Sequence, residues 1–239
     1  MEMNRNYYQK VVAVLQKNQH LVGQLFDFDF NKTPLLISNN SNTNTDLATV
    51  NTTNTKEFSL YAKQLLAKHN AVASVGGYLE ERVIYRGRPL FDQDNRCIHL
   101  GIDINTKAGA TIFTPLDSRV HSFADNDRNG DYGPTIILEH ELDNMTFYTL
   151  YGHLSRNSLI GLSNKTILAK GTPFAQLGRS SENGNWPPHL HFQLILDMGK
   201  HSGDFPGVCT REQLEHFRYI CPDPNLILQI DLLEKTTQV

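Results

Sequence analysis

Two stretches in the first 77 residues place apolar side chains at helical spacing. Over residues 4–26 the apolar positions recur at one-turn and two-turn intervals with polar residues between them, which predicts an amphipathic helix. These positions are Tyr7, Val11, Leu15, Val22 and Leu25. The second stretch, residues 57–77, begins with Glu57, which suits the first turn of a helix, and it ends at a glycine pair. We expect two packing helices.

The segment between these stretches is almost entirely polar. From Ser38 to Thr55, 12 of 18 residues are Asn or Thr, and such a segment cannot bury enough apolar surface to offset its ordering entropy. It is interpreted as a flexible linker or long surface loop, and a further hypothesis is that it folds over the functional site as an inhibitory segment. The predicted organisation is a helical segment at 1–37, an Asn/Thr-rich linker at 38–56, a helix at 57–77 and a β-rich domain with a C-terminal extension at 78–239.

From Tyr78 onward the pattern changes to short apolar and β-branched runs separated by Gly, Pro, Asn and Asp. Regularly spaced short runs with turn residues between them are typical of an antiparallel sheet. The predicted strands are residues 110–113, 119–123, 135–140, 146–151, 173–177 and 190–196. The fold class is therefore mainly β with an α-helical N-terminal appendage, and residues 211–217 are expected to form a short helix in the extension.

Charge and hydropathy exclude two classes of partner. The net charge is -3 and the Lys and Arg residues are scattered, so the basic surface of a nucleic-acid-binding protein is not expected. No window approaches the ~20 apolar residues of a membrane span, and the longest early apolar run, Val11–Leu15, is too short for a signal peptide. This pattern predicts a cytoplasmic protein, with export by another route left open. The oligomeric state stays undetermined.

The candidate chemistry lies in five side chains of the β-rich part. His99 and Asp103 flank a glycine, so a turn or strand end can direct both side chains at one ion. His189 and His191 are two residues apart in a predicted strand and therefore share a face, and His153 ends another strand beside it. A catalytic zinc takes three such ligands and keeps a fourth position for water, whose pKa it lowers to about 7. The pattern predicts one Zn²⁺ per chain, with the remaining histidines available for proton transfer.

Several motifs in order resemble the lysostaphin/LytM-type zinc metalloendopeptidases, which cleave cell-wall peptidoglycan and have a groove over an antiparallel sheet. The resemblance covers residues 78–196. Its main motifs are His99-Leu-Gly-Ile-Asp103, Thr114-Pro115-Leu-Asp117, Tyr151-Gly-His153-Leu, Lys170-Gly171 and Pro188-His-Leu-His-Phe192. It implies that His99, Asp103 and His191 bind zinc. It also implies that His153 and His189 lie beside the water as general base and transition-state stabiliser, and it leaves open which of them accepts the proton.

Two positions bear on the substrate groove, and a third bears on the orientation of a metal ligand. Trp186 and the two prolines after it replace the small Ser, Thr and Gly residues usual in that family, which predicts a bulky, stiff groove wall. Tyr151 is a second candidate groove residue, with a hydroxyl that could reach the developing oxyanion, although aromatic packing within the strand is the commoner role of such a residue. Gln193 stands where the family usually has Glu, so a neutral amide replaces the carboxylate that would orient an imidazole.

The leading hypothesis is a zinc-dependent endopeptidase that hydrolyses peptide or amide bonds, and the resemblance implies peptidoglycan cross-links as its substrate. One alternative is a catalytically silent binding or regulatory module of the same fold. The filled ligand positions argue against that alternative. Another alternative is an intracellular zinc amide hydrolase with a substrate outside the cell wall, which the missing export signal favours.

Overall fold

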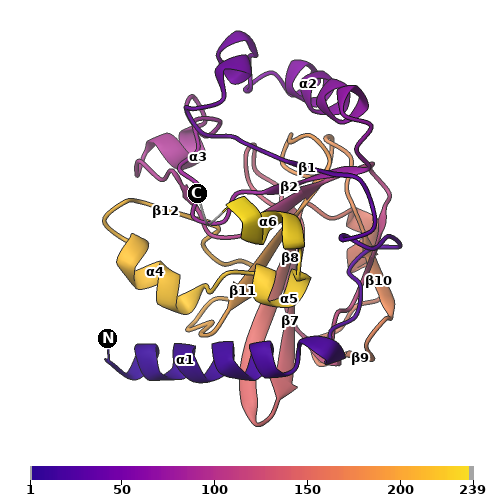
Figure 1. Cartoon of the computed structure of the whole chain (residues 1–239), viewed down its shortest axis with the longest axis vertical. Helices are drawn as coiled ribbons and strands as arrows, with labels where there is room; N and C mark the ends of the chain where they lie inside the picture. Colours follow the sequence, from indigo (N-terminus) through magenta and orange to yellow (C-terminus); the bar gives the residue numbers. More distant parts are fainter. Residues whose placement is uncertain (1, 237–239) are drawn as a thin grey trace.

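The computed structural model describes residues 2–236, and its centre is a single large β-sheet (Figure 1). The strands of this sheet are β1 (Leu35–Ile37), β2 (Ala73–Gly76), β4 (Ile102–Asn105), β6 (Ser118–Asn126), β7 (Gly133–Leu142), β8 (Met145–Gly152), β9 (Ile167–Leu168) and β11 (His189–Ile195). They lie in the order β1-β2-β4-β11-β8-β7-β6-β9. Neighbours are antiparallel except for the parallel pair β1 and β2. The mainly β fold class is confirmed.

Smaller elements complete the molecule. Two further two-stranded sheets pair β5 (Thr111–Phe113) with β10 (Pro173–Gln176) and β3 (Ile98–His99) with β12 (Val208–Cys209). The α-helices are α1 (Glu2–Lys17), α2 (Thr55–Lys68), α3 (Pro89–Asp92), α4 (Leu214–Ile220), α5 (Asn225–Leu228) and α6 (Asp231–Thr236). Short 3-10 helices are Gln19–Leu21, Thr45–Thr49 and Arg156–Leu159. No helix in the described part of the chain is long and apolar enough to cross a membrane.

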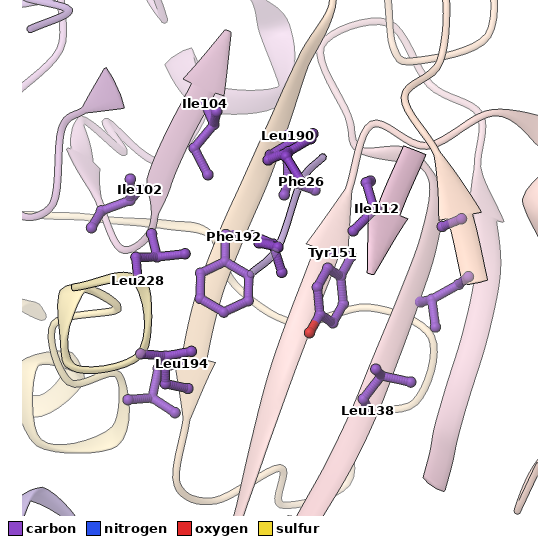
Figure 2. Packing of buried hydrophobic residues seen from close by; sticks show 14 of the residues in the cluster. Phe26, Ile102, Ile104, Ile112, Leu138, Tyr151, Leu190, Phe192, Leu194 and Leu228 are labelled. Atoms are coloured by element: carbon purple, nitrogen blue, oxygen red, sulfur yellow. The ribbon is translucent and has the colours of Figure 1, made fainter. Parts of the chain in front are cut away.

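All six predicted strands are present, as β5, β6, β7, β8, β10 and β11. Successive side chains of a strand point to opposite sides, so the residues of these strands are divided between the two faces of the sheet. Figure 2 shows one face, where Ile102, Ile104, Leu190 and Phe192 pack into the main hydrophobic core with residues from both ends of the chain. The residues between them on β4 and β11 therefore project to the other face.

The first predicted helix is shorter than expected. It ends at Lys17, where the Asn18 side chain donates to the Val14 carbonyl oxygen at 3.0 Å and closes the last turn. Leu25 is buried in the core beyond α1, so the apolar spacing over residues 18–26 reflects core contacts of a chain that has left the α-helix and passes through the short 3-10 helix Gln19–Leu21.

The second predicted helix is wrong at its C-terminal end. α2 begins at Thr55, where the Asn54 side chain accepts hydrogen bonds from the backbone, and it ends at Lys68. Asn70 then adopts a left-handed conformation with φ +51°, and Ala73–Gly76 forms β2 between β1 and β4. All four residues of β2 are buried. A short apolar run of this kind cannot be told from helix by periodicity.

The Asn/Thr-rich segment is a series of side-chain-stabilised turns. The side-chain oxygens of Asn39, Asn44 and Asn51 each accept a hydrogen bond from the backbone N–H two residues later. Leu47 of this segment is buried and packs with Phe58 of α2 in a hydrophobic cluster that also includes Trp186. These contacts hold the segment beside α2 and the loop that precedes β11.

Candidate metal centre

The register of the central strands collects the candidate metal ligands. Asp103 on β4 lies directly opposite His191 on β11, and His191 lies opposite Gly152 at the end of β8, one residue before His153. His99 ends β3, and two residues separate it from the start of β4. The intervening Gly101 permits this approach because a Cβ atom there would lie 2.7 Å from Cε1 of His191.

Three donor atoms converge on one point between these strands. Nε2 of His99 lies 2.8 Å from Nδ1 of His191, and Oδ1 of Asp103 lies 3.3 Å from each of these nitrogens. All three residues are buried. Two imidazole nitrogens and one carboxylate oxygen are a donor set typical of catalytic zinc sites, which keep a fourth position open.

The hydrogen bonds on the outer side of each ring fix which nitrogen faces this point. Nδ1 of His99 lies 3.0 Å from the Gly77 carbonyl oxygen, and Nε2 of His191 lies 2.9 Å from Oε1 of Gln193. Since both oxygens can only accept, we assign the protons to these outer nitrogens. The inner nitrogens then present lone pairs to each other, and Oδ1 of Asp103 has no hydrogen-bond partner although it is buried. A cation satisfies all three atoms, so the residues fit a bound metal.

Burial and a neighbouring guanidinium set the charge state of these ligands. Burial and, to a smaller extent, the Arg82 guanidinium lower the pKa of His99 to about 3, against the opposing effect of Asp103. Burial alone would raise the pKa of Asp103, but Arg82 and His99 hold that pKa well below its ordinary value. A neutral imidazole and an ionised carboxylate are the forms that bind metal ions.

His153 and His189 form a pair next to the ligands. Their ring centroids are 4.1 Å apart, and Nε2 of His189 lies 3.9 Å from Oδ1 of Asp103. Nδ1 of His153 donates to the Asn183 carbonyl oxygen at 2.9 Å, and Nδ1 of His189 donates to that of Pro187 at 2.8 Å, which leaves each Nε2 as an acceptor. Burial lowers the pKa of both imidazoles. Both are therefore neutral at pH 7 and able to accept a proton.

A cavity of about 370 Å³ opens over these five side chains. Its lining includes the three candidate ligands, the histidine pair and Trp186. Ser38, Asn39 and Asn40, at the start of the Asn/Thr-rich segment, also line it. An inhibitory role of that segment stays a prediction.

The two candidate groove residues differ in their positions. Trp186 lines the cavity, with the Arg88 guanidinium 3.7 Å above its ring and the aromatic rings of Tyr85 and Phe91 packed nearby. The expectation for Tyr151 was wrong. Tyr151 is fully buried beside Phe192 in the core face of the sheet, where Figure 2 shows it, and its hydroxyl bonds to Thr149. Strand alternation directs it away from the face that carries His191.

Sequence reasoning missed Arg82 as a neighbour of the site. Its side chain is 2% exposed, and Nη1 donates to Oδ2 of Asp103 at 2.5 Å. In the sequence it follows Glu80 and Glu81, and such a charge run is typical of an exposed turn. The contact joins residues 21 positions apart, so no local spacing signals it.

Gln193 keeps the orienting role that a carboxylate was expected to have. Its Oε1 accepts from His191, while its Nε2 donates to the Pro206 carbonyl oxygen at 3.1 Å and to Sγ of Cys221 at 3.2 Å. An amide suits this position because it must both accept and donate, and a carboxylate could only accept.

Residues 97–202 match Peptidase family M23. Among solved structures, the chain is similar to a zinc-containing peptidase from Vibrio cholerae, with 26% identity over 41% of this chain and 27% of that chain and a TM-score of 0.32. It is similar to Csd3 from Helicobacter pylori, with 20% identity over 59% of this chain and 33% of that chain and a TM-score of 0.33. It is also similar to the catalytic domain of lysostaphin from Staphylococcus simulans, with 18% identity over 65% of this chain and 96% of that chain and a TM-score of 0.40.

The match to the family includes all five candidate histidine and aspartate residues. The chain spans less than half the length of the Vibrio and Helicobacter proteins. No curated protein matches it.

Proposed function

We propose that the chain is a zinc-dependent endopeptidase that hydrolyses peptide or amide bonds of peptidoglycan cross-links, and the match of residues 97–202 to peptidase family M23 supports this proposal. One observation carries the proposal. The inner nitrogens of His99 and His191 and Oδ1 of Asp103 lie within 3.3 Å of one another with no proton available to join them. This arrangement is unfavourable without a cation and matches a hydrolytic zinc site.

His99, Asp103 and His191 would hold the ion. Zinc bound there supplies Lewis-acid chemistry, since it lowers the pKa of a bound water and polarises the substrate carbonyl group. The protein itself positions the ligands. The paired strands β4 and β11 fix Asp103 opposite His191, and Gln193 and the Gly77 carbonyl oxygen hold the two imidazole rings in the tautomer that binds metal.

His153 and His189 would move the proton. Each is neutral, each is fixed by its Nδ1–H on a backbone carbonyl oxygen, and each has an unprotonated Nε2. One of the pair would accept the proton of the attacking water at its Nε2 and return that proton to the leaving amine. The other would donate to the developing oxyanion after its own Nε2 has taken up a proton from solvent. The shared tautomer and environment of the two rings leave the division of these roles open.

The test is incubation of the zinc-loaded protein with purified peptidoglycan, followed by mass spectrometry of the soluble fragments. We expect fragments with newly formed peptide termini, and none from the His191→Ala variant. A protein that binds zinc stoichiometrically but releases no fragment from peptidoglycan contradicts the substrate assignment. A protein that binds no zinc contradicts the proposal as a whole, and the silent binding module then explains the fold better.

A further inference from the structure

Arg82 joins the metal centre to a segment outside the family match. It lies 15 residues before the matched region 97–202, and its guanidinium is buried between Glu80 and Asp103. Nε donates to Oε2 of Glu80 at 2.8 Å, and Nη1 donates to Oδ2 of Asp103 at 2.5 Å and to the Tyr85 hydroxyl at 3.1 Å. The planar guanidinium thus bridges two carboxylates in a fixed orientation.

This bridge divides the two oxygens of Asp103 between different partners. Oδ2 is bound to Arg82, whereas Oδ1 faces His99 and His191 and has no hydrogen bond. A carboxylate held by one oxygen cannot rotate freely. Arg82 therefore leaves Oδ1 as the oxygen available to a metal ion.

The same segment also orients a second ligand. The Gly77 carbonyl oxygen accepts from Nδ1 of His99, and Gly77 lies close to the guanidinium of Arg82. A Cβ atom at Gly77 would lie 2.1 Å from Nη2 of Arg82, and the backbone there has φ +100°, so only glycine combines the carbonyl contact with the buried guanidinium. Glu80 is fixed in turn because its Oε1 accepts from the backbone N–H of Asn40 at 2.8 Å.

We propose that residues 77–82 are part of the metal centre, with Arg82 as a positioning residue that reserves Oδ1 of Asp103 for the ion. The proposal rests on the proposed metal site. A buried positive charge beside the ligands also repels a cation, but Glu80 offsets that charge at 2.8 Å. Glu80, Arg82 and Asp103 together carry one net negative charge, so the group as a whole does not repel a cation. We therefore expect the net effect of Arg82 on metal binding to come from its orientation of Asp103.

The experiment compares zinc affinity and the visible spectrum of bound Co²⁺ in the full-length wild type, Arg82→Met and Arg82→Lys. Arg86→Met is the matched control because Arg86 is an exposed arginine four residues further along the chain. We expect Arg82→Met to weaken zinc binding about 10- to 100-fold, the usual effect of removing a group that orients a metal ligand. We also expect an altered Co²⁺ spectrum, since these bands report the coordination of the ion. Arg82→Lys should fall between Arg82→Met and wild type, and Arg86→Met should match wild type.

Thermal unfolding of the metal-free variants separates positioning from folding. If Arg82→Met lowers the unfolding temperature but binds zinc within twofold of wild type with the same Co²⁺ spectrum, Arg82 is only structural and the proposal is overturned. If Arg82→Met does not fold, Arg82→Lys carries the test, because an ammonium group lacks the fork that bridges Glu80 and Asp103. A zinc affinity of Arg82→Lys equal to that of the wild type would then overturn the proposal. Failure of the wild type itself to bind zinc would instead refute the proposed function.

Discussion

Asp103 and His191 are direct partners across the antiparallel pair β4 and β11, with Oδ1 of one 3.3 Å from Nδ1 of the other. The sheet register therefore sets the spacing of these two candidate ligands, and neither depends on a flexible loop. Backbone hydrogen bonds of the central strands hold the donor atoms in place before any ion binds. Such preorganisation favours binding because less conformational entropy is lost.

Removing one of these two residues should remove the ion. We expect His191→Ala to retain no zinc after gel filtration, because two remaining protein ligands hold the ion poorly. Metal analysis by mass spectrometry measures this directly, with His69→Ala, an exposed histidine, as the control. Zinc content equal to that of the wild type would show that the ligand set is wrong.

The histidine pair should separate metal binding from turnover. Replacing His153 or His189 with Ala should leave zinc content unchanged and lower the rate of peptide hydrolysis about 10²-fold or more, the usual contribution of a general acid or base. Metal content and steady-state rates on a peptidoglycan fragment provide the measurement. Loss of zinc from either variant would make that histidine a ligand and contradict its proposed role in proton transfer.

The sequence places the candidate metal ligands together more accurately than it places the residues around them. His189 and His191 could be placed on one face because strand alternation is a local property, and β11 has that alternation. Tyr151 could not be placed, because both faces of β8 are buried near its end and the pattern there does not distinguish them. The strand β2 was mistaken for helix for a similar reason. Arg82 could not be identified at all, since its role depends on a contact formed only after folding.

A buried histidine far from the candidate ligands should make stability depend on pH. His140 is fully enclosed, with Nδ1 3.0 Å from the Asp117 carbonyl oxygen and Nε2 2.7 Å from the Thr149 hydroxyl, and burial lowers its pKa to about 4. The unfolded chain has an ordinary histidine pKa near 6.5, so between these two values the unfolded state binds more protons.

The contribution of neutral His140 to the free energy of unfolding is therefore complete above pH 6.5 and is lost as the pH falls toward 4. The total loss in the free energy of unfolding is about 3 kcal/mol. Denaturant unfolding at a series of pH values should show a weaker acid dependence in His140→Gln than in the wild type, since Gln does not titrate. His69→Gln serves as the exposed control. Equal slopes in all three proteins between pH 4 and pH 6.5 would refute this account of His140.

Gln193 provides the last prediction because it holds His191 from the side opposite the candidate metal position. Gln193→Ala removes the acceptor for Nε2 of His191, so the ring can turn or change tautomer, and zinc affinity should fall about 10- to 100-fold. Gln193→Glu keeps an acceptor for His191 but loses the donor to the Pro206 carbonyl oxygen. We expect the Glu variant to bind zinc more tightly than the Ala variant while unfolding at a lower temperature than the wild type. Competition with a chelator measures the affinities, and equal zinc binding by Gln193→Ala and the wild type would show that the amide does not orient His191.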